Sequence, residues 1–143
     1  MSARDDGEAP RLDRLVQLVE LLDEYEQLYV RFGDHPSSET GGSIDYESGL
    51  RMPGQSVNRL RPPTWWTRPP EDWLARQICQ YAHLLERSPR HQGWIVRGTE
   101  VGHGPDDEPL LDDVEVVGRI GRALLDEAQL TYQRRFDQGR VSH

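Results

Sequence analysis

The sequence predicts an α+β fold in which three helices pack on a small, mainly antiparallel sheet. Three segments carry apolar residues at the spacing of three and four that is typical of an amphipathic helix, and three others are short runs typical of strands. They follow one another as helix, strand, loop with one short strand, helix, strand, strand and helix. This order indicates three helices against a single small sheet.

The first helix is predicted from Arg11 to about Gln27. Its inward residues recur three and four positions apart, and they are Leu12, Leu15, Val16, Val19 and Leu22. From Leu28 the period changes to two, which is the period of a strand. Residues 28–32 are therefore expected to form a strand that ends at Gly33, with Tyr29 and Arg31 on one face.

Residues 34–63 are expected to form a long loop, with a short strand around residues 55–60. The segment is rich in glycine, proline and serine, and loops of this length within a compact domain are often functional. Its charges are segregated, because residues 34–48 hold four acids and no base, whereas residues 49–70 hold four arginines and no acid. We expect these arginines to neutralise the acids of residues 34–48 and 105–115.

The second helix is predicted to begin at Pro69-Pro70-Glu71-Asp72, because proline is tolerated in the first turn and carboxylates favour the positive end of the helix dipole. It is expected to end near Ser88 and Pro89. Residues 94–103 and 110–117 are predicted to be the strands of a hairpin with an acidic tip. The last helix is predicted from about Arg119 to Phe136.

The composition predicts one domain over residues 11–137, with disordered residues 1–10 and 138–143 at its ends. All 17 basic residues are arginine, which excludes a lysine Schiff base and the lysine of a phosphate-binding P-loop. The acidic net charge of −8 argues against non-specific binding to nucleic acid, and no stretch is apolar enough to span a membrane. The single cysteine, Cys79, excludes an internal disulfide, so a cytoplasmic location is expected.

Two strand arginines are candidates for binding an anion. Arg31 and Arg97 each lie among apolar neighbours in a predicted strand. An arginine that faces a pocket can hold a carboxylate or phosphate through two parallel hydrogen bonds. The alternative is an arginine that faces solvent or forms an ion pair, for example Arg97 with Glu115 across the hairpin.

The tip of the hairpin contains the candidate acid–base residues. His103 ends a predicted strand beside a carboxylate-rich loop that includes Asp106 and Glu108, where a histidine could be oriented as a general base. Six acids between residues 106 and 115 could instead hold a hard cation. Two prolines stiffen this turn, however, so a solvated loop is favoured and no metal site is predicted.

Trp65 and Trp66 lie among arginines in residues 58–68. Aromatic rings combined with cations are typical of single-stranded nucleic-acid binding. The overall acidity of the chain favours another interpretation, in which the two tryptophans anchor the proline-rich crossing onto the following helix. Both residues remain candidates for ligand binding.

The common catalytic motifs are absent, and no cofactor is indicated. The sequence contains no Gly-x-Ser-x-Gly elbow, no His-Glu-x-x-His pair and no Gly-x-Gly-x-x-Gly turn that opens a helix. The leading hypothesis is a protein that binds a small anionic ligand or a protein partner. A small enzyme acting on a phosphorylated, nucleotide-like or carboxylate substrate is the alternative, with the two strand arginines as anchors and His103, Asp106 or Glu108 as acid or base. A homodimer through the aromatic loop is a third hypothesis.

Several short motifs together resemble those of a family of small actinobacterial proteins of unknown function, over about residues 12–137. The motifs are Tyr29-Val30-Arg31, Asp45-x-x-Ser48-Gly49-Leu50, Pro53-Gly54-x-Ser56-Val57, Trp65-Trp66, Trp73-Leu74-Ala75-Arg76-Gln77 and Gly102-x-Gly104-Pro105-Asp106-x-Glu108-Pro109-Leu110. This resemblance implies no activity, cofactor or substrate. The chain is also similar to ADP-ribosyltransferase-type folds, which would imply an NAD-using transferase with Arg31, Ser56 and Glu115 in its site. No aromatic-rich NAD-clamping motif can be aligned.

Overall fold

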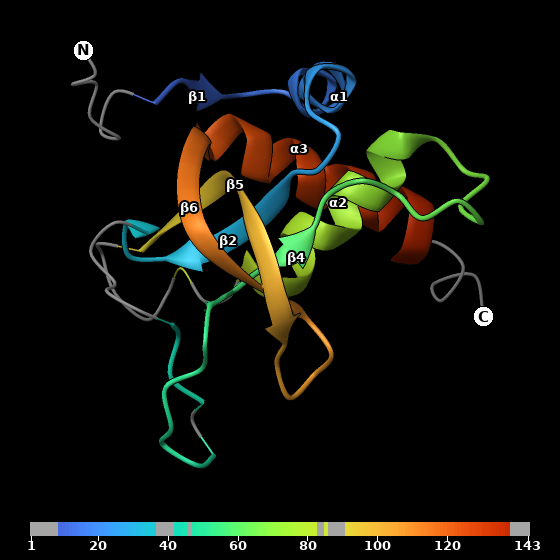
Figure 1. Ribbon diagram of the computed structural model, residues 1–143. Helices are drawn as coiled ribbons and strands as arrows, with labels where there is room; N and C mark the ends of the chain where they lie inside the picture. Colours follow the sequence, from blue (N-terminus) through green and yellow to red (C-terminus); the bar gives the residue numbers. More distant parts are fainter. Residues whose placement is uncertain (1–8, 37–41, 46, 83–84, 86–90, 138–143) are drawn as a thin grey trace.

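A curled β-sheet organises the molecule, as the computed structural model shows for residues 9–36, 42–45, 47–82, 85 and 91–137 (Figure 1). Two long strands, β5 (Gln92–His103) and β6 (Pro109–Ile120), form its centre. Shorter strands extend it on both sides. They are β1 (Arg11–Leu12) beside β6, β2 (Tyr29–Gly33) beside β5, β4 (Asn58–Arg59) beside β2, and β3 (Gln55–Ser56), which also pairs with β6.

The α+β prediction is confirmed, and the described residues form three α-helices. These are α1 (Leu15–Glu24), α2 (Pro70–Tyr81) and α3 (Arg122–Tyr132), and α3 continues into the π-helical turn η4 (Gln133–Asp137). The sheet differs from the predicted one because it is mixed and curls into a half-barrel (Figure 1). The pairing between β1 and β6 is parallel, whereas the other pairings are antiparallel.

The first and last helices begin later than predicted. Arg11 and Leu12 form β1 rather than helix, because the backbone of this segment bonds to the end of β6. The Arg119 amide donates to the Pro10 carbonyl at 2.9 Å, and the Gly121 amide donates to the Leu12 carbonyl at 2.9 Å. Long-range pairing therefore overrides helical periodicity at both ends of the chain. The predicted end of the second helix near Ser88 lies outside the described residues.

The predicted hairpin of β5 and β6 is present, but its strands do not alternate regularly. Three register shifts interrupt the pairing, between Ile95 and Val96, between Arg97 and Thr99, and between Glu100 and Gly102. Each inserts one unpaired residue and increases the local twist of the strands. The bulges thereby curl the sheet, and they change which side chains share a face.

The sheet buries apolar side chains on both of its faces. The larger cluster lies beneath the helices and includes Val30 and Phe32 of β2 together with Leu18 of α1 and Leu124 of α3. The smaller cluster lies on the opposite face. Its buried members are Tyr29, Val57, Trp94, Val96 and Leu111. Because successive residues of a strand point to opposite faces, Arg31 lies on the side of Tyr29 and Trp94.

Candidate functional site

Three predicted site residues, Arg31, Ser56 and Glu108, are linked by hydrogen bonds on the side of the sheet that carries the smaller apolar cluster. One guanidinium nitrogen of Arg31 donates to the Ser56 carbonyl at 2.9 Å and to the Ser43 hydroxyl at 3.3 Å. The Ser56 hydroxyl donates to a carboxylate oxygen of Glu108 at 2.7 Å. The Ser56 amide donates to the Ser43 hydroxyl at 3.1 Å. This chain of contacts joins β2, the segment before β3 and the hairpin turn.

The Glu108 carboxylate is also part of its own turn. Its second oxygen accepts a hydrogen bond from the Asp106 amide at 3.0 Å, and the Gly104 amide donates to the Glu108 carbonyl at 2.8 Å. A Cβ atom at Gly104 would lie 2.2 Å from the carboxylate, so a larger residue there would displace the Glu108 carboxylate from its present position. The Asp106 and His103 side chains are exposed beside it. Glu108 is thus held by the protein, whereas Asp106 and His103 face solvent.

Arg97 lies on the other face of the sheet from Arg31. Its guanidinium donates to Glu115 at 2.8 Å and lies 5.2 Å from the centre of the Tyr25 ring, and Tyr25 packs against the cluster beneath the helices. The hydrogen bond from Arg97 to Glu115, together with the charge of Glu115, raises the pKa of Arg97. The two candidate arginines therefore do not converge on one pocket. Arg97 thus forms the ion pair with Glu115 across the hairpin that the sequence analysis gave as the alternative to an anion site.

A buried tyrosine is coupled to two charged residues near the end of β5. The Tyr29 hydroxyl donates to Glu100 at 2.6 Å, and Arg59 donates to both carboxylate oxygens of Glu100 at 2.9 and 3.1 Å. Burial is the largest cause of the raised pKa of Tyr29, followed by its bond to Glu100. Burial also raises the pKa of Glu100, but hydrogen bonds from Tyr29 and Arg59 and the charges of Arg59 and His103 outweigh it and lower that pKa.

Trp65 and Trp66 form an aromatic surface with Trp73 of α2. The Trp66 and Trp73 ring centres lie 5.1 Å apart, and Trp65 lies 6.2 Å from Trp66 and 6.4 Å from Trp73. The Trp66 indole donates to the Pro69 carbonyl at 3.1 Å, which fastens the crossing to the start of α2. Trp65 is 69% exposed. We call Trp65, Trp66 and Trp73 the tryptophan surface.

Arg68 connects the tryptophan surface to the end of the last helix. Its guanidinium lies 5.7 Å from the Trp66 ring centre and 4.5 Å from the Phe136 ring centre. It also donates to the Arg135 carbonyl at 3.1 Å and forms an ion pair with Asp72 at 3.3 Å. Arg135 contacts the same carboxylate at 3.4 Å. Two arginines thus compensate the charge of Asp72, which is only 2% exposed.

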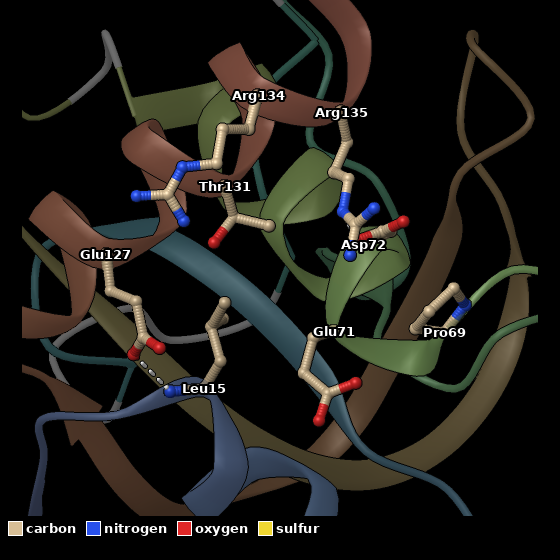
Figure 2. A pocket seen from close by; sticks show the side chains of 8 residues that line it. All are labelled: Leu15, Pro69, Glu71, Asp72, Glu127, Thr131, Arg134 and Arg135. Carbon is tan, nitrogen blue, oxygen red and sulfur yellow. Dashed lines mark hydrogen bonds and ion pairs between the residues drawn. The ribbon is translucent and has the colours of Figure 1, made fainter.

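A cavity of about 330 Å³ lies where the ends of the three helices meet (Figure 2). We call it the helix-end cavity. Its walls come from the start of α1, the start of α2, and the end of α3 with η4. The lining residues are Leu15, Pro69, Glu71, Asp72, Glu127, Thr131, Arg134 and Arg135.

The charges around the helix-end cavity are partly used by the protein. Glu127 accepts hydrogen bonds from the Leu15 amide at 2.8 Å and from Arg14 at 3.3 Å, so it caps the start of α1 (Figure 2). Asp72 is held by its two arginines. Glu71 and Arg134, by contrast, form no hydrogen bond or ion pair with the described residues. The cavity therefore contains one carboxylate and one guanidinium that remain available to a ligand.

The sequence prediction of the site did not include the helix-end cavity. Residues 119–136 were assigned to one regular helix, which gave Arg134 and Arg135 no particular role. The sequence does contain a signal for this site. Two adjacent arginines end the last predicted helix, and Glu71 and Asp72 begin the preceding one, so opposite charges are available where the two helix ends meet. The chain turns into a π-helix at these arginines, and π-helical turns are frequent at functional sites.

Two further observations concern metals and membranes. Within residues 9–36, 42–45, 47–82, 85 and 91–137, no three His, Cys, Asp or Glu side chains are grouped so that they could hold a metal ion. None of the described helices has the length and apolar character needed to cross a membrane.

Comparison with known proteins gives a family but no activity. Neither a curated protein nor a solved structure matches this chain. A model described as a family of unknown function, DUF6098, matches residues 5–142. Because this match covers nearly the whole sequence, the chain belongs to the DUF6098 family of unknown function.

Proposed function

We propose that this protein binds a small anionic ligand in the helix-end cavity, with Arg134 as the anchor. The observation that carries the proposal is an arginine without a protein partner among the described residues, in the wall of a cavity of about 330 Å³. Pockets for small molecules commonly have volumes of about 300–1,000 Å³. A guanidinium in such a wall suits a carboxylate or a phosphate.

The pairing of the cavity's charges supports an anion, although the whole chain is acidic. The lining carries three carboxylates, Glu71, Asp72 and Glu127, and two arginines, Arg134 and Arg135. Asp72 contacts Arg68 and Arg135, and Glu127 contacts Arg14, so arginines neutralise two of the three carboxylates. The guanidinium of Arg134 is left to attract an anion at short range, because salt screens the more distant charges within about 8–10 Å.

The two arginines that the sequence suggested are less suited to this role. Arg97 is already paired with Glu115, with the guanidinium 2.8 Å from the carboxylate. Arg31 uses one of its terminal nitrogens to bind Ser43 and Ser56, which hold neighbouring segments together. A ligand at either place would have to displace a protein partner, whereas a ligand beside Arg134 would not.

A titration followed by NMR tests the proposal. Isotope-labelled protein is titrated with acetate and with inorganic phosphate, and amide shifts are expected at Glu71, Thr131 and Arg134. Arg134→Gln should weaken binding by roughly tenfold to a hundredfold, since a hydrogen bond to a charged group contributes about 1.5–3 kcal/mol. Arg122→Gln is the matched control, because Arg122 lies on α3, which η4 continues, and its side chain is exposed. Equal affinity in the two variants would contradict the proposal.

A protein partner at the tryptophan surface is a second candidate function. Trp65 is 69% exposed, and arginines lie over the two neighbouring rings, with Arg76 at 5.7 Å from Trp73. Tryptophan and arginine are the residues most enriched at binding hot spots. Analytical ultracentrifugation at two concentrations tests whether the partner is a second copy of this chain. Trp65→Ser should abolish such a dimer, and Leu130→Ser, at another exposed apolar residue, should not.

A further inference from the structure

The helix-end cavity presents two free charges of opposite sign. Arg134 comes from η4 and Glu71 from the first turn of α2. Neither forms a hydrogen bond or an ion pair with a described residue. Figure 2 shows their charged groups on different walls, with Thr131 and Leu15 between them. A ligand that fills the cavity would meet a cation at one end and an anion at the other.

The other charged groups of the cavity are less available, because the protein already pairs them. Asp72 is 2% exposed and contacts Arg68 at 3.3 Å and Arg135 at 3.4 Å. If Arg135 moved towards a ligand, the buried Asp72 carboxylate would keep only Arg68 as an ion-pair partner, which is unfavourable. Glu127 is engaged by the first turn of α1. A ligand can therefore bind Arg134 and Glu71 without breaking a contact that the protein makes within its described residues.

A ligand with only a negative charge would fit one half of this site. It would gain the attraction of Arg134, but it would also meet the Glu71 carboxylate, and like charges that face each other oppose binding. A ligand with only a positive charge would have the converse problem. A ligand that carries both charges would satisfy both residues, and the Thr131 hydroxyl between them could bind its middle part.

We infer that the ligand of the helix-end cavity is zwitterionic, with a carboxylate that binds Arg134 and an ammonium group that binds Glu71. Free amino acids and short peptides are the class of molecule with this charge pattern. The inference rests on the function proposed above, because it takes the same cavity and adds the second charge. It makes Glu71 a determinant of specificity rather than of anion binding itself.

The test uses a length series of ω-amino acids, because it compares ligands that differ only in their charges. Glycine, 4-aminobutanoate and 6-aminohexanoate are titrated into the labelled full-length protein, each beside the matched carboxylic acid and the matched amine. At the best length, the zwitterion should bind at least tenfold more tightly than its matched acid or amine. The amide shifts should map to Glu71, Thr131 and Arg134.

Two variants assign the charges. Glu71→Gln should reduce the affinity for the zwitterion to that for the matched acid, and should leave the acid bound equally or more tightly. Arg134→Gln should reduce it to the level of the matched amine. Glu20→Gln on the exposed face of α1 is the control and should change nothing. An unfolded variant is recognised by its collapsed amide spectrum, and Glu71→Ala then serves as the second test.

The outcomes separate this inference from the proposed function. If matched acids bind as tightly as zwitterions at every length, and Glu71→Gln has no effect, the ligand is a simple anion. The zwitterion inference is then wrong while the anion site stands. If neither acids nor zwitterions shift the cavity residues, both proposals are wrong.

Discussion

Replacing Tyr29 by phenylalanine should lower the free energy of unfolding by about 1–2 kcal/mol. Tyr29 is 2% exposed, and its hydroxyl donates to the Glu100 carboxylate at 2.6 Å. A hydrogen bond to a charged group contributes about 1.5–3 kcal/mol. The Glu100 side chain is 32% exposed and keeps Arg59, so solvent and Arg59 compensate part of the loss. The expected value therefore lies at the lower end of this range.

Urea denaturation measures the effect, and a double-mutant cycle isolates it. Tyr29→Phe, Glu100→Gln and the double variant should show a coupling energy of about 1 kcal/mol. Tyr132→Phe is the control, because Tyr132 stacks on Phe136 at 4.9 Å and its hydroxyl forms no hydrogen bond with the described residues. A loss below about 0.5 kcal/mol for Tyr29→Phe, or strict additivity with Glu100→Gln, would refute this reasoning.

The same pair predicts how stability depends on pH. The pKa of Tyr29 is raised in the folded protein, so its contribution is present below the unfolded pKa of about 10 and is lost as the pH rises above it. The pKa of Glu100 is lowered, so its contribution is present above about pH 4 and is lost as the pH falls. The stability difference between the native protein and Tyr29→Phe should therefore be largest between these limits. A difference that grows above pH 10 would contradict the assignment.

Two further variants test other contacts by urea denaturation. Arg61→Ala should cost about 2 kcal/mol, because Arg61 donates to the carbonyls of Leu22, Tyr25 and Glu26 and places a cation at the end of α1; the exposed Arg122→Ala should cost less than about 0.5 kcal/mol. Gly54→Ala should cost about 1–3 kcal/mol, because a Cβ atom there would lie 2.7 Å from a backbone oxygen of β6. Gly102→Ala, where nothing lies within 4 Å, should be nearly neutral.

Some elements were predictable because their signals are local. The period of two from Leu28 to Phe32 gave β2, and the glycine and proline residues after His103 gave the hairpin turn. The proline and carboxylate residues before Trp73 gave the start of α2. Each of these signals depends on backbone preferences within a few residues, which do not require the rest of the fold.

Other predictions were wrong because distant segments decide the outcome. Val16 was expected inside but is 45% exposed, while Leu18 is fully buried. The face of α1 depends on where α2 and α3 lie, and on Arg11 and Leu12 being drawn into β1. The same holds for the arginines of residues 49–70. Three of them contact Glu100, Asp72 and the carbonyls at the end of α1, rather than the acids of residues 34–48 and 105–115.

The sequence by itself determined the α+β class, most strands, and the exclusion of lysine chemistry and internal disulfides. These conclusions depend on composition and on periodicity along the chain. Tertiary structure alone decided that Arg31 and Arg97 lie on opposite faces, and that Glu71 and Arg134 share one cavity. The physical reason is that the register of β2 against β5 sets Arg31 opposite Trp94, an odd number of residues from Arg97, and that packing of helix ends brings together residues more than sixty positions apart.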